Sequence, residues 1–312
     1  MRISPSFSLR PSITFLALLL GLISACEEPI ESPVDLLESR LVISSTFAPD
    51  RLVTVRLSAT QPATGEVQAA DIRDATVNLF DGRDLLEQLK YVPDENPANP
   101  GSYRTQEFQP LVGRSYTLHV SVDGMTPVSA RSSIPLSVPI QDVVISDRSE
   151  MVIGSEIAYS YNLHVDYADP ALETNYYDLR INQEVIPFRV TDGDTTFYNP
   201  ILKTVSAPDA PGVDLSTPGG QASVLLQDKP AGGVDLRLRS VINPHQEILG
   251  NLVMELRTVS EPYFRFQQEA SRRAGGGLGG VSQARVNSYT NVQAGYGLFA
   301  GYSVAYRSIP WR

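Results

Sequence analysis

The sequence predicts an all-β protein: an N-terminal immunoglobulin-like sandwich followed by a second β-sandwich domain with one short helix. Hydrophobic residues make up 42% of the 312 residues and charged residues 19%, which is enough apolar material for a core and too little charge for a disordered chain. The 22 glycines and 23 prolines are typical of a chain with many strands and turns. From residue 40 onward, apolar and polar side chains alternate with the period of two that half-buried strands show.

The charge balance narrows the classes of partner. The chain has 25 Lys and Arg against 35 Asp and Glu, a net charge of -10. A nucleic-acid backbone or an anionic lipid surface repels such a chain on average, so we expect no nucleic-acid partner. The composition identifies no small-molecule ligand.

Residues 1–25 are predicted to be a lipoprotein signal peptide. Arg2 and Arg10 precede an uncharged apolar run at residues 13–23, the order of regions that a signal peptide shows. The run has about half of the ~20 residues that a membrane-spanning helix needs, so we expect it to be cleaved off rather than kept as a transmembrane anchor.

The end of this segment predicts a lipid anchor. Ile23-Ser24-Ala25-Cys26 matches the bacterial lipobox, with cleavage between Ala25 and Cys26. Cys26 is the only cysteine, so it has no partner for an internal disulfide, and acylation would remove an exposed thiol. A diacylglycerol on the sulfur and a third chain, such as palmitate, on the new amino terminus would hold the protein firmly at a membrane. The alternative is an ordinary cysteine near the end of a general secretory signal.

Residues 26–39 are predicted to be an acidic tether. Glu27-Glu28-Pro29-Ile30-Glu31-Ser32-Pro33 is acidic, broken by prolines and without apolar periodicity. An acidic cluster directly after the acylated cysteine resembles the surface-export signal of lipoproteins in Bacteroidetes-type bacteria. A solvated linker without any export role is the alternative.

Residues 40–140 are predicted to form the immunoglobulin-like sandwich. Turn signals such as Asp81-Gly82 and Asp123-Gly124 separate the strands, and the proline-rich segment 134–139 marks the boundary near residue 140. Short strands at this spacing, without a cysteine pair, predict an immunoglobulin-like fold that lacks the disulfide. The expected strands are residues 41–47, 52–57, 75–80, 102–108, 115–122 and 126–133.

Residues 141–312 are predicted to form the second β-rich domain. Its loops, such as 207–220, are rich in Pro and Gly and are expected at the surface. The expected strands are residues 156–167, 175–183, 185–190, 195–198, 222–226, 234–242 and 251–259, with one or two more strands in 296–306.

One helix is predicted between residue 260 and the glycines at 275–277. Ser260 is expected to cap it, Pro262 suits its first turn, and Arg272-Arg273 suit the negative end of the helix dipole. Tyr263, Phe266 and Ala270 are expected to share one face of the helix.

The sequence offers little for catalysis. It contains no H-E-x-x-H or G-x-S-x-G motif, and the only cysteine is assigned to lipid, so thiol nucleophiles and thiolate metal sites are not expected. His119 and His164 lie in strand patterns and His245 in a loop, where histidines are most often structural or surface residues. We therefore expect no enzyme, no cofactor and no metal, and a hydrolase with a dispersed Ser-His-Asp site is the exception left open.

Two acidic groups offer carboxylates that calcium would accept. Asp192-Gly193-Asp194 lies between two expected strands, and a hairpin turn explains the same residues without the spacing of a calcium loop. Asp166, Asp169 and Glu173 form a second group in a loop. The expectation for both groups is a structural role.

Tyrosines could form a binding surface for sugars or peptides. Tyr159, Tyr161 and Tyr167 lie at odd positions of one expected strand, so they share one face. Packing in the core is the preferred interpretation.

The order of several short motifs resembles one family. The lipobox cysteine is followed by Leu41-Val42-Ile43-Ser44, Ala75-Thr76-Val77, Gly101-Ser102-Tyr103 and Gly113-Arg114-Ser115-Tyr116-Thr117-Leu118, and the chain closes with Asn291-Val292-Gln293-Ala294-Gly295-Tyr296-Gly297-Leu298-Phe299-Ala300-Gly301-Tyr302. This order resembles the Bacteroidetes outer-membrane lipoprotein family known as domain of unknown function 4249. The resemblance covers almost all of the chain after the signal peptide, and its specificity comes from the order of the motifs.

The resemblance implies an accessory role beside a TonB-dependent outer-membrane transporter, because members of the family are typically encoded next to one. It implies no catalytic residue. The expected function is a lipid-anchored protein of the outer membrane, with a surface-exposed position as one alternative, that binds a nutrient or docks on a transporter. A surface adhesive or structural lipoprotein is the second function class, and the dispersed hydrolase the third. Gly295, Gly297 and Gly301 are expected to allow close strand packing or bulges rather than to line a ligand site.

Overall fold

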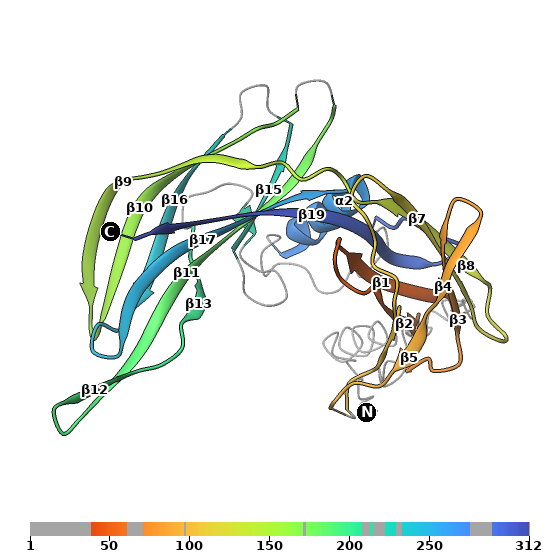
Figure 1. The fold of residues 1–312 in the computed structure, drawn as a ribbon, viewed down its shortest axis with the longest axis horizontal. Helices are drawn as coiled ribbons and strands as arrows, with labels where there is room; N and C mark the ends of the chain where they lie inside the picture. Colours follow the sequence, from red (N-terminus) through yellow and green to blue (C-terminus); the bar gives the residue numbers. More distant parts are fainter. Residues whose placement is uncertain are drawn as a thin grey trace, which may run out of the picture. The chain divides into compact units, whose positions relative to one another are not determined.

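The structure is a computed structural model that describes residues 39–60, 71–96, 98–170, 173–207, 213–214, 222–228, 233–274 and 289–311. Over these residues the chain forms three β-sheets and one helix, α2 (Glu261–Ala274) (Figure 1). The predicted all-β fold class, with sandwiches and one short helix, is confirmed.

The largest of these sheets has eleven strands and contains segments from both ends of the chain. In order, its main path is β14 (Val213–Asp214), β15 (Ala222–Gln227), β11 (Tyr176–Thr191), β17 (Glu247–Val259), β19 (Tyr296–Pro310), β1 (Leu41–Phe47), β2 (Thr54–Ala59), β6 (Ser102–Arg104) and β5 (Lys90–Val92). Two further strands pair with β11 beside this path: β12 (Asp194–Phe197) and β13 (Ile201–Thr204).

Two smaller sheets complete the described fold. The five-stranded sheet has the order β18 (Val292–Gln293), β8 (Val128–Ser133), β7 (Ser115–Ser121), β3 (Thr76–Asp81) and β4 (Asp84–Gln88). The three-stranded sheet has the order β16 (Val234–Ile242), β10 (Glu156–Tyr167) and β9 (Ile140–Ile153).

The first core lies between β1 and β2 of the large sheet and the five-stranded sheet. Alternate residues of β1, such as Leu41 and Ile43, are fully buried, and Val77 and Leu118 meet them from the opposite sheet. This alternation is the pattern from which the strands were predicted, and it shows why they form, since one face of each strand leaves water.

The second core lies between β11 and β17 of the large sheet and the three-stranded sheet. Leu179 and Leu256 contribute from the large sheet, and Leu163 and Leu238 from β10 and β16. Trp311, the only tryptophan of the chain, packs against this cluster.

Strand β19 belongs to both sandwiches. Its first part pairs in parallel with β1, and its second part, from Tyr302 onward, pairs antiparallel with β17. A division at residue 140 assigns Val292 and Phe299 to the second domain, whereas both side chains pack in the first core. The domain boundary near residue 140 stays a prediction. The pairing of β19 with both β1 and β17 shows that this last strand connects the two cores.

Several elements differ from those expected. Strand β9 was not predicted, because most of its side chains are exposed and show no alternation. It forms because β10 pairs with it along most of its length, with a register shift near Asp147, whose φ is 48°. The two strands expected at 175–183 and 185–190 are one strand, β11, with an irregular register between Gln183 and Val185 in its pairing with β17.

Helix α2 packs on the large sheet by a face that only partly coincides with that of Tyr263, Phe266 and Ala270. Tyr263 and Phe264 are buried, Phe266 is half-buried, and Ala270 is exposed. Ser260 precedes the helix as predicted, but its hydroxyl accepts a hydrogen bond from Ser132 Oγ at 3.1 Å. The side chains of Arg272-Arg273 and the glycines at 275–277 lie outside the described residues.

Candidate functional site

The predicted lipidation site lies outside the described residues. Ala25, Cys26, the signal peptide at 1–25 and all but the last residue of the tether at 26–39 fall in the segment 1–38. Among the described residues, the structure contains no helix whose length and apolarity would allow it to cross a bilayer. The anchor therefore stays a prediction from the sequence.

The three histidines lie on separate elements. His164 on β10 is half-buried, and its Nδ1 lies 2.8 Å from Oδ1 of the exposed Asp235 of β16. His119 on β7 packs against the edge of the Phe80 ring, with the ring centroids 5.1 Å apart, and His245 lies in the loop between β16 and β17. Among the described side chains, no group of three or more His, Cys, Asp and Glu has the arrangement to hold a metal ion.

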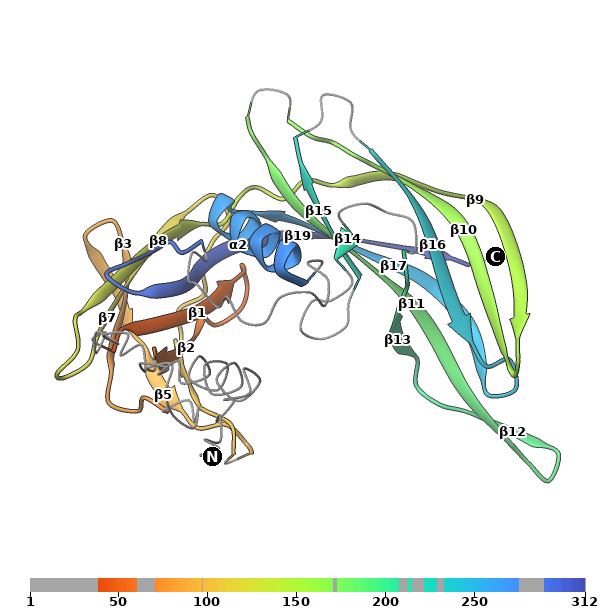
Figure 2. The ribbon, with the colours of Figure 1, turned by 180° about the vertical axis from the view of Figure 1, so that it is seen from behind.

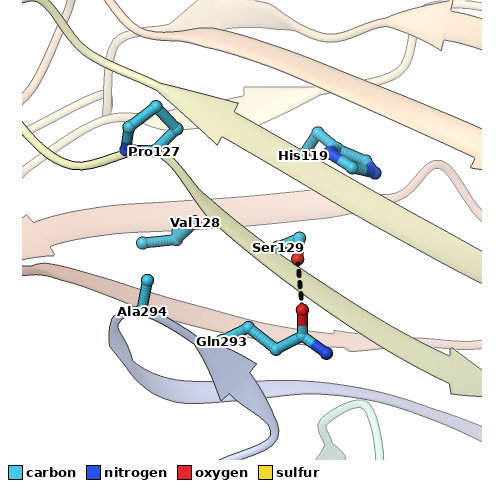
Figure 3. A pocket seen from close by; sticks show the side chains of 6 residues that line it. All are labelled: His119, Pro127, Val128, Ser129, Gln293 and Ala294. Carbon is cyan, nitrogen blue, oxygen red and sulfur yellow. Dashed lines mark hydrogen bonds between the residues drawn. The ribbon is translucent and has the colours of Figure 1, made fainter.

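A shallow pocket lies where the edge strand β18 pairs with β8, and His119 of β7 also lines it (Figure 3). It has a volume of about 210 Å³ and is lined by His119, Pro127, Val128, Ser129, Gln293 and Ala294. Ser129 Oγ donates a hydrogen bond of 3.2 Å to Gln293 Oε1 across it. Sites that enclose drug-sized ligands are usually larger, about 300–1,000 Å³. The polar groups of this pocket connect strand β18 to β8.

A second pocket lies beside the carboxylate of Glu87, which the sequence analysis did not single out. The amide groups of Gln106, Glu107 and Phe108 donate hydrogen bonds to this carboxylate at 2.6, 3.4 and 2.9 Å. Burial alone would raise the pKa of Glu87, but these hydrogen bonds lower it below its usual range. The carboxylate thus holds the loop that follows β6.

Asp192-Gly193-Asp194 forms a hairpin turn, as predicted. Asp192 and Gly193 have φ angles of 51° and 91°, and Thr191 pairs with Asp194 across the turn. Positive φ at both central residues is typical of the two-residue turn that matches the twist of a hairpin. The turn therefore accounts for these residues.

The second acidic group also makes internal hydrogen bonds. Tyr177 donates its hydroxyl proton to Asp169, and the amide of Asn175 donates to Asp228 Oδ1 at 3.0 Å. Burial, followed by the hydrogen bond to Asp169, raises the pKa of Tyr177 well above its usual range. The backbone of Asp166 lies opposite that of Asp142 in the pairing of β10 with β9, and Asn175 Nδ2 donates to the backbone carbonyl of Glu173. These contacts hold the entry to β11.

The tyrosine stripe packs in the second core, as preferred. Tyr161 and Tyr167 are buried, and Tyr159 is half-buried. The rings of Tyr159 and Tyr161 both contact Trp311, with centroids 5.7 and 4.8 Å away. Their role is to fill the space beside the end of β19.

Alkaline pH should destabilise the protein through its buried tyrosines. Burial raises the pKa of Tyr161, Tyr167 and Tyr263 to about 12, from a usual value of 10.0. Between these pH values the unfolded chain releases protons that the folded chain keeps, so the stabilisation is complete below pH 10 and falls as the pH rises to 12. Denaturant unfolding followed by Trp311 fluorescence should show this fall. A constant free energy of unfolding across this window would contradict the prediction.

The closing motif of the sequence builds the junction between β19 and β1. A Cβ atom on Gly297, whose φ is 102°, would lie 1.9 Å from the carbonyl oxygen of Ile43, and one on Gly301 would lie 2.4 Å from the carbonyl oxygen of Ser133. Asn291 joins β19 to β8, since its side chain donates to Phe299 O at 2.7 Å and to Arg131 O at 3.1 Å and accepts from Phe299 N at 3.0 Å. The close strand packing expected of the glycines is confirmed.

A buried polar network under α2 was not predicted. Asp178 on β11 is 1% exposed and accepts hydrogen bonds from Tyr263 Oη at 2.7 Å, from Arg180 Nε at 3.0 Å, and from the Ser223 hydroxyl. Arg180 Nη2 also donates to Tyr263 Oη at 3.0 Å. Next to it, the guanidinium of Arg257 lies 4.5 Å from the centre of the Tyr302 ring.

This network holds the helix on the sheet. A buried carboxylate is costly unless it is paired and hydrogen-bonded, and here three donors from three different elements satisfy it. Burial and then the charge of Asp178 raise the pKa of Tyr263, so its hydroxyl keeps the proton that it donates. Asp178 and Arg180 share one predicted strand, but no sequence signal joins them to Ser223 or Tyr263, which lie in other predicted elements.

Comparison with known proteins gives little beyond the family. No curated protein matches the chain. Among solved structures, the three N-terminal domains of the highly immunogenic outer capsid protein Hoc of bacteriophage RB49 are similar at 13% identity with a TM-score of 0.22. That alignment covers 70% of this chain and 63% of the phage structure.

The family model for a domain of unknown function, DUF4249, matches residues 27–308. The match includes both sandwiches, helix α2 and the closing motif. The chain therefore belongs to the DUF4249 family.

Proposed function

We propose that this protein is a lipid-anchored component of the cell envelope of a Bacteroidetes-type bacterium, and that it acts as a non-catalytic binding partner of a TonB-dependent outer-membrane transporter. The observation that carries the proposal is the lipobox Ile23-Ser24-Ala25-Cys26, whose cysteine is the only one in the chain. Acyl chains on Cys26 would hold the two sandwiches beside the membrane without a spanning helix.

The roles of the polar clusters support a binding function rather than a catalytic one. Asp178, Asp169 and Glu87 each accept several hydrogen bonds from the protein itself, and these contacts join separate elements. Groups occupied in this way stabilise the fold and are not presented to a substrate. Confinement to the plane of the membrane would raise the effective concentration at a transporter, so even a weak interface would be occupied.

The test compares wild type with Cys26→Ala, each with a carboxy-terminal tag, in a cell that produces the protein naturally. Wild type should incorporate labelled palmitate, stay in the membrane fraction and co-purify with a TonB-dependent transporter after gentle detergent extraction. Cys26→Ala should lose the label and the membrane association, and its recovery of the transporter should fall. Ser24→Ala keeps a small residue in the lipobox and should behave as wild type.

Two results would contradict the proposal. If the Cys26→Ala variant remains firmly bound to the membrane, a lipid on Cys26 is not what anchors the protein. Wild type that recovers no transporter, together with unchanged uptake in a strain lacking the protein, would favour an adhesive lipoprotein or a hydrolase.

A further inference from the structure

The end of strand β11 extends beyond the sheet as a two-stranded ribbon. Pairing between β11 and β17 ends at Pro187 and Glu247. Residues 188–191 continue from this point and pair with β12 across the turn at Asp192 and Gly193. Figures 1 and 2 show this hairpin reaching past the neighbouring strand ends.

One face of this ribbon is apolar. Phe188 lies opposite Phe197, with ring centroids 6.1 Å apart, and Val190 lies opposite Thr195. Residues directly opposite each other in an antiparallel pair share a face, as do alternate residues of one strand. The other face carries Arg189, Thr191, Asp194 and Thr196.

The apolar face continues onto the neighbouring strands. Ile186 lies opposite Ile248 of β17, and Glu184 lies opposite Leu202 of β13. We call the apolar side chains on this face the ribbon patch: Ile186, Phe188, Val190, Phe197, Leu202 and Ile248.

The ribbon patch lies on the opposite side of the sheet from the second core. Odd-numbered residues of β11, such as Leu179 and Ile181, face that core, whereas the patch residues of β11 are even-numbered. Val190, Phe197, Leu202 and Ile248 are 57%, 58%, 58% and 44% exposed. Together they expose on the order of 400 Å² of apolar surface, a size at which patches on soluble proteins are often functional.

A ribbon of this kind gains little stability by itself. Two-stranded hairpins in water are marginally stable, and exposed apolar strands invite unwanted association. A matching surface would bury the apolar face and would add stability to the ribbon.

The charges select the kind of surface. Asp192 and Asp194 place two carboxylates at the ribbon tip, and Arg189, the one Lys or Arg of residues 188–197, lies on the face away from the patch. The chain as a whole has a net charge of -10. A second copy and an anionic lipid surface are both repelled by this charge. A different protein with Lys or Arg beside an apolar surface is complementary to it.

We propose that the ribbon patch is the docking surface for a different protein, which presents an apolar surface bordered by basic side chains. The inference rests on the proposed function only in placing that protein in the same membrane. It assigns the contact to one face of the β11–β12 ribbon.

The test introduces a photo-crosslinking phenylalanine derivative into the full-length protein in its natural host. At position Phe197 it keeps an aromatic side chain in the patch, and at position Thr196 it lies next in sequence on the opposite face. The Phe197 position should give one crosslinked product, a different protein, in which mass spectrometry places the crosslink beside Lys or Arg. The Thr196 position should give little of it.

Two substitutions in the Phe197 crosslinking background test the patch and the charges separately. Leu202→Ser should lower the crosslink yield at least about tenfold, the effect of truncating an interface anchor. Leu111→Ser is the matched control, because Leu111 is 59% exposed in the first sandwich, and should leave the yield unchanged. Replacing Asp192 and Asp194 together by Asn keeps the turn and should lower the yield several-fold.

Other products would overturn the inference. A crosslink to a second copy, a crosslink to lipid, or no crosslink at position Phe197 would each show that no such protein covers the patch. The proposed function fails separately. If the crosslinked protein is not a transporter, the docking surface is supported and the transporter partnership is not. If a transporter co-purifies but position Phe197 gives no crosslink, the transporter partnership is supported and the docking surface is not.

Discussion

Gly297→Ala should destabilise the protein by about 4 kcal/mol or more, at the upper end of what single substitutions do. The new Cβ atom would lie 1.9 Å from the carbonyl oxygen of Ile43, which is backbone in the paired strand β1 and has no rotamer with which to move away. In addition, the φ of 102° is one that residues with a side chain rarely adopt. Relief requires separation of β19 from β1, and with it loss of the strand shared by the two cores.

Gly124→Ala is the matched control for the backbone conformation. Gly124 has a φ of 77°, but a Cβ atom there would meet nothing within 4 Å. Only the left-handed conformation is penalised, by roughly 1–2 kcal/mol. Denaturant unfolding followed by Trp311 fluorescence and by circular dichroism should separate the two variants, and equal losses of stability would contradict the close approach at Gly297.

Asp178→Asn should lower the free energy of unfolding by about 3 kcal/mol, because removal of the carboxylate charge leaves the largely buried Arg180 without this counter-charge. The carboxylate accepts from Arg180, Tyr263 and Ser223, whereas an amide offers one acceptor oxygen and two protons. Helix α2 should lose protection first, since Tyr263 is the contact that joins it to Asp178. Hydrogen exchange of residues 261–274 measures this local effect.

Asp235→Asn provides the same chemical change at an exposed carboxylate. Asp235 contacts His164 Nδ1 at the surface, where polar contacts between side chains contribute little. This variant should unfold at the same denaturant concentration as wild type. If Asp178→Asn also leaves the unfolding midpoint and the exchange of α2 unchanged, the network under the helix does not hold it in place.

The sequence predicted strands well where burial on one face is local and regular. Strand β1 is an example, since its alternating apolar residues lie in the first core. Strand β9 was missed for the opposite reason: its side chains are mostly exposed, and only pairing with β10 makes it a strand. For α2 the sequence indicated a shared face of Tyr263, Phe266 and Ala270, whereas the fold buries Phe264 beside Tyr263 and leaves Ala270 exposed.

Among the candidate sites, too, those marked by a local sequence signal were predicted and those formed by distant residues were not. The turn at Asp192-Gly193 was predictable, since the two-residue loop is a local signal. The network around Asp178 was not, because Asp178 and Tyr263 lie 85 positions apart and nothing near either residue marks the other. The ribbon patch was not predicted either, since valine and phenylalanine usually lie in the core and nothing local marks Val190 and Phe197 as exposed.

The all-β class, most strand positions, the glycines needed for close packing and the lipobox are predictable from the chain alone, because each depends on neighbouring residues or on a period of two. The fold was needed to find which polar residues meet, that β19 joins both cores, and that one apolar face of β11 and β12 is left in water. Sheet pairing brings together segments far apart in the chain, so burial depends on the partner strand rather than on adjacent residues.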